Sequence, residues 1–235
     1  MTTSYRGPAD VQAWIDGPIV TPTSLPGYPH QWRPIVDGTT PSERKAAALE
    51  LFPPAFTGLL PEFFALFTEG LLDALVIQSR QHSGDDSLGS AYCVAYILAT
   101  QEPGVPNDLF YGTEPEPQTP GNAAIFWDSL PSVMRDFVTT VHGGFCDSEA
   151  RYGPLPPSMM ATFEQRVGFS DLRVNWPPEI PRPDRVMIIL QTLGHIEYAV
   201  SPDTPPNTVI VIDSRETSIE PFWSELDSQM AAIFG

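Results

Sequence analysis

Three strand-like runs near the end of the chain restrict its fold more than any other feature. They span residues 185–190, 195–200 and 208–213, and each contains several apolar residues. The connections between them are short and rich in turn-forming residues: Gln191-Thr-Leu-Gly194 and Ser201-Pro-Asp-Thr-Pro-Pro-Asn207. Short connections suit antiparallel strands, whereas a parallel crossover needs a dozen residues or more. The pattern therefore predicts an antiparallel meander.

A helix is predicted after the meander, from Thr217 or Ser218 to Phe234. Its apolar residues recur at helical spacing: Ile219, Phe222, Trp223, Leu226, Met230 and Ile233. Its polar residues occupy the other face: Glu220, Glu225, Asp227 and Gln229. We expect the apolar face to pack on the sheet. The fold class that follows is α+β, with a mixed, largely antiparallel β-sheet flanked by helices.

A shorter helix is expected around residues 128–142. Asp128 or Ser129 can supply an N-cap oxygen, and Pro131 falls in the first turn, where its missing N–H costs little. Gly143 follows the last apolar residue, at a position where a left-handed cap is expected. The residues predicted on the apolar face are Val133, Phe137, Val138 and Val141.

Residues 1–60 are rich in Pro and Gly and are expected to form an irregular N-terminal extension. Within them, Thr40 and Glu43 form a capping box, which predicts a helix that ends before Pro53. A second short helix is expected after Pro61. Residues 71–78 and 91–98 have the composition of strands, and the turn cluster at 83–86 predicts that they form a hairpin.

Residues 101–122 form the clearest interruption in the chain. They contain five prolines and show almost no hydrophobic periodicity. A loop of this length is either a linker between two domains or a long excursion within one domain. We favour a single domain over residues 1–235, because the flanking strand-like runs are short for independent sheets.

The charge of the chain excludes some partners. Its net charge is −17, with 29 acidic and 12 basic residues, and such a surface repels nucleic acid. No apolar run approaches the ~20 residues of a membrane span, and the first residues lack the apolar core of a signal peptide. Two cysteines give no disulfide framework, and Cys93 is expected to be a buried free thiol. These features predict a cytoplasmic protein.

The acidic residues are also unevenly distributed. Between Arg80 and Arg135 the chain has no basic residue. Seven acidic residues fall in that interval: Asp85, Asp86, Glu102, Asp108, Glu114, Glu116 and Asp128. An acidic surface accelerates encounter with a basic partner, although solubility alone is the commoner reason for acidity.

Motifs for catalysis are absent from the sequence. It has no Gly-rich phosphate loop, no HExxH zinc helix, no CxxC pair and no Gly-x-Ser-x-Gly elbow. His82 with Asp85 and Asp86 could form a metal cluster, but solvated turn residues are the commoner case. His142 is either catalytic or, as we favour, a residue at a helix C-terminus that meets free carbonyls. We therefore predict no catalytic residue, no metal and no cofactor.

Several short motifs resemble the SUKH superfamily. They are Leu130-Pro131, the helix with Phe137, Val141-His-Gly-Gly-Phe145 and Gly153-Pro-Leu-Pro156. Ser218-Ile-Glu-Pro-Phe-Trp-Ser-Glu-Leu226 is similar to the final segment of that family. The resemblance covers residues 123–235 and, more loosely, 71–98, while residues 1–60 and 101–122 depart from the family pattern.

The SUKH superfamily groups yeast cell-wall-synthesis regulators with bacterial immunity proteins against secreted toxins. The resemblance implies an α+β domain whose sheet is flanked by helices, and a binding role without catalysis. Our leading hypothesis is therefore an immunity protein that neutralises a basic toxin, such as a nuclease or a nucleotide-modifying enzyme, by binding it.

The acidic interval and nearby aromatic residues are the predicted interface. Its carboxylates would mimic the anionic substrate of the toxin, and exposed aromatic side chains would anchor the contact. Trp127 suits the core equally well. A regulatory scaffold protein, or a hydrolase with unrecognised carboxylates, remains an alternative. The predicted partner-binding residues are Asp85, Asp86, Asp108, Tyr111, Glu114, Glu116 and Trp127.

Overall fold

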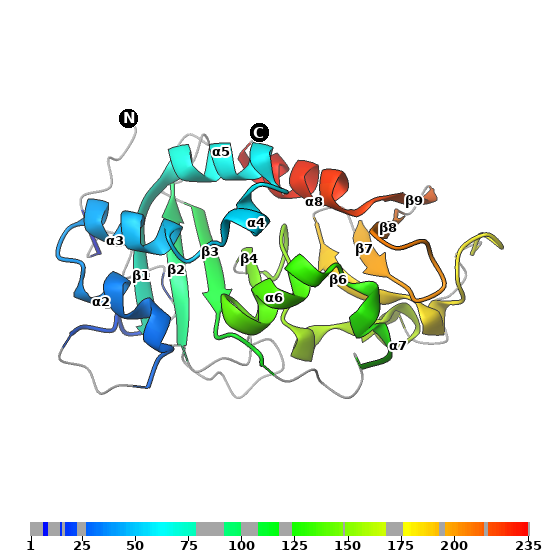
Figure 1. Ribbon diagram of the computed structural model, residues 1–235, viewed down its shortest axis with the longest axis horizontal. Helices are drawn as coiled ribbons and strands as arrows, with labels where there is room; N and C mark the ends of the chain where they lie inside the picture. Colours follow the sequence, from blue (N-terminus) through cyan, green and yellow to red (C-terminus); the bar gives the residue numbers. More distant parts are fainter. Residues whose placement is uncertain are drawn as a thin grey trace.

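Two antiparallel sheets lie side by side in the computed structural model, with helices packed along them (Figure 1). The structure describes residues 7–8, 15, 17–22, 27–78, 92–99, 108–117, 124–147, 149–167, 176–192, 196–213 and 216–234. The α+β class and the antiparallel pairing are as predicted. Among the described residues, the strands form two sheets, one of four strands and one of five.

The first sheet has the order β1-β2-β3-β4. Its strands are β1 (Leu71–Gln78), β2 (Tyr92–Leu98), β3 (Asp108–Thr113) and β4 (Phe145–Asp147). The antiparallel pairing of β1 with β2 confirms the predicted pair of strands. The turn expected at 83–86 lies outside the described residues.

Strand β3 corrects the prediction of an unstructured excursion over residues 101–122. It pairs with β2 on one side and with β4 on the other, and Phe110 is fully buried. Pro115, which follows the strand, lies outside it and removes no ladder hydrogen bond. A strand of six residues gives too short a hydrophobic pattern to be recognised in a Pro-rich segment. The strand forms because β2 and β4 supply its hydrogen-bond partners.

The second sheet is a meander with the order β5-β6-β7-β8-β9. The predicted antiparallel run is confirmed as β6 (Met187–Gln191), β7 (Glu197–Val200) and β8 (Thr208–Ile212). Two further strands complete the sheet, β5 (Ala161–Thr162) and β9 (Thr217–Pro221).

The last helix begins later than predicted. Residues 217–221 pair with β8 as strand β9, and helix α8 (Phe222–Ala231) follows Pro221, with the short turn η5 (Ala232–Phe234) after it. Pro221 has no N–H to donate, which suits the end of an edge strand as well as the residue before a helix. Helix α8 packs mainly on α5 (Pro61–Gly70) and also contacts β8 and β9.

Asp227 of α8 was expected on the polar face but is buried. Its Oδ1 accepts a hydrogen bond from the backbone N–H of Phe63 at 2.8 Å, and its Oδ2 accepts one from Glu62 at 3.1 Å. These N–H groups belong to the first turn of α5, which has no cap from its own N-cap residue. Asp227 therefore caps a helix whose first turn lies 164 to 165 residues earlier in the chain.

The segment after β4 connects the two sheets. Pro154 accepts a hydrogen bond from Phe145 N at 2.9 Å, on the side of β4. Leu155 N donates to Ile189 O at 2.8 Å and Tyr152 N donates to Gln191 O at 2.9 Å, on the side of β6. Backbone hydrogen bonds thus run from one sheet to the other through residues 152–155.

The N-terminal part contributes more to the fold than an irregular extension would. It contains η1 (His30–Trp32), α2 (Arg33–Asp37), α3 (Pro41–Leu49) and α4 (Pro54–Thr57). The capping box of Thr40 and Glu43 is confirmed. Trp32 and Phe56 are fully buried in the main core, so residues 30–60 are part of the fold.

Helix α6 (Ser132–Thr140) confirms the short helix, and aromatic rings surround it. Phe137 stacks on Phe56 with ring centroids 4.0 Å apart. The N-terminus differs from the prediction: Pro131 is the N-cap residue, after the turn η2 (Ala124–Ser129), and no side chain caps it. Met134 is buried, whereas Val133 is only partly buried.

Gly143 has a role other than the predicted left-handed cap. Its φ is not in the left-handed region, and its N–H donates to Thr113 O and Glu114 O of the adjacent chain segment. A Cβ at this position would lie 2.4 Å from Glu114 O. The glycine is therefore required by close backbone approach, which sequence pattern alone does not distinguish from a cap.

Shorter elements complete the connections. They are η3 (Pro157–Met159), α7 (Phe163–Val167) and η4 (Pro183–Arg185). Among the described residues, no helix has the length and apolar character that a membrane span requires.

Candidate functional site

The predicted interface residues do not form one cluster in the part of the chain that the structure describes. Asp108 begins β3 and Glu114 follows its other end, which puts them about 20 Å apart along an extended strand. Asp128 lies on η2. Asp85 and Asp86 lie outside the described residues.

Glu114 and Glu116 accept hydrogen bonds within the fold. Glu116 accepts from Ser158 N at 3.0 Å and from Ser158 Oγ at 2.7 Å. Glu114 Oε2 accepts from Tyr92 N at 3.4 Å. Both side chains are partly buried, so they hold neighbouring segments in place as well as carrying charge.

The two predicted aromatic anchors are not prominent on the surface. Tyr111 was expected to be exposed, but only 7% of it is accessible, and it packs with Leu75 and Ile97 on the second face of the first sheet. Trp127 is partly buried against the main core, the alternative that its sequence position left open.

His142 is a buried core residue. Its Nε2 lies 2.6 Å from Tyr96 Oη, and its Nδ1 lies 3.3 Å from Thr113 O. Burial lowers the pKa of His142 to about 3, so the ring is neutral at pH 7. A neutral ring that donates from Nδ1 to Thr113 O and accepts from Tyr96 satisfies both contacts.

The position of His142 differs from the expected one at a helix C-terminus, where it would meet the free carbonyls of the helix. Its side chain hydrogen-bonds to a carbonyl of β3 rather than to the last carbonyls of α6. The ring also packs against those of Trp32, Phe52 and Phe145. Gly112 makes room for it, since a Cβ there would lie 2.4 Å from the ring.

Every arginine that the structure describes is ion-paired with a carboxylate. One pair is fully internal: Arg44 donates from Nε to Asp73 Oδ1 at 2.8 Å, and none of Asp73 is exposed. The others lie nearer the surface, at Arg33, Arg135, Arg151, Arg166, Arg182 and Arg185. Intramolecular pairing thus neutralises the cations locally and leaves a surplus of carboxylates.

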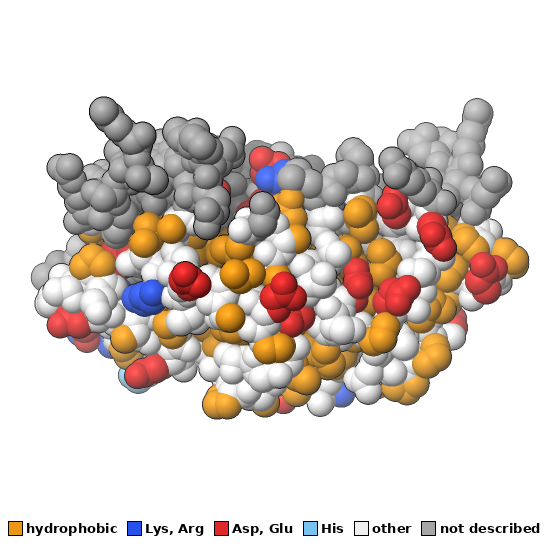
Figure 2. All heavy atoms as spheres, turned by 90° about the horizontal axis from the view of Figure 1, so that it is seen from above, with side chains coloured by type: hydrophobic (Ala, Val, Ile, Leu, Met, Phe, Trp, Pro, Cys, Tyr) orange, Lys and Arg blue, Asp and Glu red, His pale blue; other side chains and the backbone are white. Residues whose placement is uncertain are grey.

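Part of that surplus lies at the end of α3, on α5 and at β9, where Glu50, Glu62, Glu69 and Glu216 are exposed and Glu220 is half-buried. We use the name acidic surface for Glu50, Glu62, Glu69, Glu216 and Glu220, whose side chains make no ion pair among the described residues. Figure 2, which looks onto the side where α5 and α8 lie in Figure 1, shows acidic side chains distributed along the molecule and few basic ones.

The single lysine of the sequence lies near this surface but is tied to the backbone. Lys45 on α3 donates from Nζ to Thr68 O of α5 at 2.7 Å. A cation bound to a carbonyl still offsets part of the local negative potential. The larger number of unpaired glutamates on α5 and beside it nevertheless leaves this side negative.

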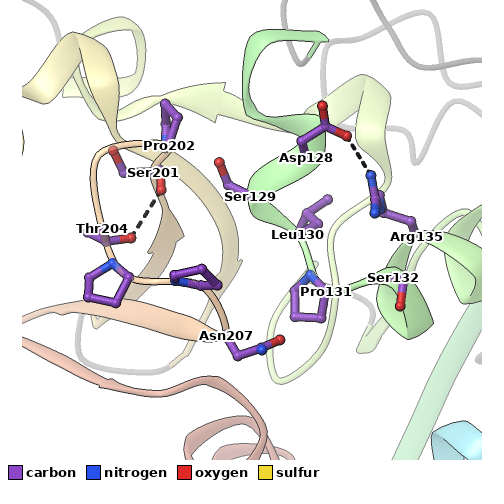
Figure 3. A pocket seen from close by; sticks show the side chains of 12 residues that line it. Asp128, Ser129, Leu130, Pro131, Ser132, Arg135, Ser201, Pro202, Thr204 and Asn207 are labelled. Atoms are coloured by element: carbon purple, nitrogen blue, oxygen red, sulfur yellow. Dashed lines mark hydrogen bonds and ion pairs between the residues drawn. The ribbon is translucent and has the colours of Figure 1, made fainter.

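A groove separates the start of α6 from the loop between β7 and β8 (Figure 3). Its volume is about 380 Å³. Leu130 and Pro131 form one wall, and Pro202 and Asn207 lie on the other. Arg135 points to Asp128 on its rim, with Nη1 2.6 Å from Oδ1.

The groove offers hydrogen-bonding groups rather than a reactive centre. Its described lining includes Ser129, Ser132, Ser201 and Thr204, and no histidine or cysteine. Thr204 Oγ1 donates to Ser201 O at 3.0 Å, so part of this capacity is used within the loop. The groove offers apolar contacts from its walls and hydrogen bonds from its hydroxyl groups to a short polar segment.

Among the described residues, no group of three or more His, Cys, Asp or Glu side chains is arranged to hold a metal ion. The cluster of His82, Asp85 and Asp86 lies outside those residues. Cys93 and Cys146 are both buried thiols, as expected for Cys93, and burial raises the pKa of the Cys146 thiol.

No protein-family model, curated protein or solved structure matches the chain. The SUKH resemblance therefore stays a prediction that rests on the short motifs quoted above.

Proposed function

We propose that this protein is a non-catalytic immunity protein that binds and neutralises a basic bacterial toxin, such as a nuclease or a nucleotide-modifying enzyme. One observation supports the proposal most: the described arginines are all paired internally, while Glu50, Glu62 and Glu69 present unpaired charge on the helical side. A surface of this kind suits a partner that is itself positively charged.

The physical advantage of such a surface is rapid capture. Complementary charge raises association rates of proteins from about 10⁵–10⁶ M⁻¹s⁻¹ to as much as about 10⁸–10⁹ M⁻¹s⁻¹ at low salt. A toxin must be bound before it acts, so speed matters as much as affinity. We expect capture to take place in the cytoplasm, where a nuclease would meet its substrate.

The proposed interface includes the acidic surface, with the sequence-predicted residues as further contributors. Asp85, Asp86 and Asp108 are proposed to contact the partner, and Glu114, Glu116, Tyr111 and Trp127 to support the segments that present them. The alternative function is that of a scaffold protein without a toxin partner. The experiment must distinguish this function from that of an immunity protein.

The test is co-purification with the product of the neighbouring gene, followed by association kinetics at several salt concentrations. Steered capture should slow steeply between about 0.05 and 0.5 M salt, because the Debye length shrinks over this range. The double variant Glu62→Gln, Glu69→Gln should slow association several-fold.

A matched control removes the same charge elsewhere. Glu164→Gln on α7 together with Glu179→Gln should change association much less than the α5 variant, although both raise the net charge by the same amount. Equal effects of the two double variants would argue against a localised interface. A stable protein that captures no partner would argue against the immunity function itself.

A further inference from the structure

Among the described residues, β9 is the last strand of its sheet, and its register shows which backbone groups face away from β8. Asp213 N donates to Glu216 O at 3.1 Å, and Phe222 N donates to Asn207 O at 2.9 Å, at the two ends of the pairing. Hydrogen-bonded pairs alternate along an antiparallel ladder. Ser218 and Glu220 therefore bond to β8, whereas Thr217 and Ile219 direct their N–H and C=O groups outward.

An apolar row across the sheet ends at this edge. Cross-strand neighbours place Ile188, Ala199, Ile210 and Ile219 beside one another on one face. The first three are fully buried, but Ile219 is 37% exposed. An additional strand that placed an apolar residue opposite Ile219 would continue the row and cover this side chain.

The other face of β9 is acidic. Glu216, Ser218 and Glu220 alternate with Thr217 and Ile219, so their side chains share the face opposite to Ile219. Residues of an incoming strand that flank the apolar one would meet this face. Lys or Arg opposite Glu220 would pair directly with its carboxylate, and Lys or Arg opposite Ser218 would lie diagonal to Glu216 and Glu220, since unlike charges across a sheet stabilise it.

A second copy of the chain fits this edge poorly. Antiparallel pairing of β9 with β9 would bring Glu216 and Glu220 of one copy toward those of the other, in a protein of net charge −17. Like charges across a sheet are destabilising, and acidic side chains with Pro221 protect the edge from self-association. A basic strand meets no such repulsion.

We propose that β9 is a docking edge for an extended segment of the basic partner, added antiparallel to the sheet. The segment carries an apolar side chain opposite Ile219, with Lys or Arg on each side of it. This inference rests on the proposed function, because it assigns the means by which the same basic partner is recognised. Backbone hydrogen bonds to Thr217 and Ile219 supply affinity, and the alternating side chains supply specificity.

The probe is the synthetic peptide Lys-Val-Lys-Val-Lys-Val-Lys, added to the full chain. Binding should slow hydrogen exchange at the amides of Thr217 and Ile219 and leave those of Ser218 and Glu220 nearly unchanged, because the latter already bond to β8. Methylating the amide nitrogens of the three Val residues should abolish binding, whereas methylating the inner Lys amides should preserve it. The Glu-Val peptide of the same length should not bind.

Two variants test the same edge from the side of the protein. Ile219→Pro removes an outward donor without removing a bond to β8, and should weaken binding of the peptide about tenfold or more, equivalent to one or two hydrogen bonds. Glu220→Gln should weaken it about threefold and reduce its salt dependence. If Ile219→Pro fails to fold, the hydrogen exchange of the Thr217 and Ile219 amides in the unmodified protein still tests the docking edge.

The possible results separate the proposals. Protection at Thr217 and Ile219 with the methylation pattern above supports the docking edge. Peptide binding that leaves these amides unprotected, or a dimer of the chain that protects them without peptide, overturns it. If the Ile219→Pro variant captures the toxin at the same rate as the unmodified protein, the docking-edge proposal is overturned, whereas the proposed immunity function is not.

Discussion

The two sheets differ in whether another segment of the chain pairs with their outer edge strands. In the first sheet, β1 is covered by the segment at residues 18–20: Val20 N donates to Val76 O at 2.8 Å, and Gln78 N donates to Pro18 O at 3.0 Å. In the second sheet, β9 has no further strand on its outer side among the described residues, and Ile219 is exposed there. One edge is covered by another part of the chain, whereas no described strand pairs with the other, which we propose as the docking edge.

The side chains packed inside the two sheets also differ. The helical side of the first sheet carries a dense group of aromatic rings, including Phe52, Phe67 and Tyr96, together with the buried His142. The second sheet is built from aliphatic strands, and α8 extends from it onto α5. We expect substitutions in the first sheet to have the largest effects on stability, because they disrupt aromatic packing and buried polar bonds.

The largest effect is expected at the ion pair that joins α3 to β1. Asp73→Ala leaves the guanidinium of Arg44 buried without its carboxylate and should lower the free energy of unfolding by about 3–5 kcal/mol. Arg185→Ala, which breaks an exposed pair with Asp203, is the control and should cost at most about 1 kcal/mol. Urea unfolding measures both, and equal losses would contradict the comparison.

The next effect is a pH dependence from His142. The folded pKa is about 3, below the ordinary value of 6.5, so the unfolded chain binds a proton that the folded chain excludes. Stability from this group is therefore complete above pH 6.5 and falls toward pH 3, with a slope that approaches about 1.4 kcal/mol per pH unit.

His142→Gln tests this dependence, because it cannot titrate. Unfolding in urea from pH 7 to pH 4 should show a shallower loss of stability in His142→Gln than in the unmodified protein. His30→Gln, at an exposed histidine on η1, should retain the steeper loss. A slope unchanged by His142→Gln would mean that the ring is not held neutral.

A smaller effect is expected where the second half of the chain stabilises the first. Asp227→Ala removes the cap of α5 and should lower the free energy of unfolding by about 1 kcal/mol. Asp227→Asn keeps one acceptor oxygen and should lose less. Thermal unfolding by circular dichroism measures both, and a larger loss in Asp227→Asn than in Asp227→Ala would exclude a capping role.

The smallest effects compare the two edges directly. Val20→Pro removes a donor that bonds to β1 and should cost about 1 kcal/mol. Ile219→Pro removes an outward donor and part of the packing beside Ile210, and should cost less than Val20→Pro. If both substitutions destabilise the protein equally, the outer edge of β9 is covered in solution and the proposed docking edge is wrong.

Much of the fold could be predicted because its signals are local. The capping box at Thr40, the strand at residues 71–78 and the meander of β6, β7 and β8 depend on neighbours only a few positions away in the chain. The candidate site was harder to predict. A run of carboxylates in sequence implies a surface patch only if its segments lie together, and β3 separates Asp108 from Glu114.

The sequence by itself determined the α+β class, the antiparallel meander and the acidic character of the molecule, because side-chain periodicity and net charge do not depend on distant contacts. Only the tertiary structure decided the roles of β3, β9 and Asp227. Each of these is defined by hydrogen bonds to another part of the chain: β3 to β4, β9 to β8, and Asp227 to the first turn of α5. Such partners leave no periodic signal in the residues themselves.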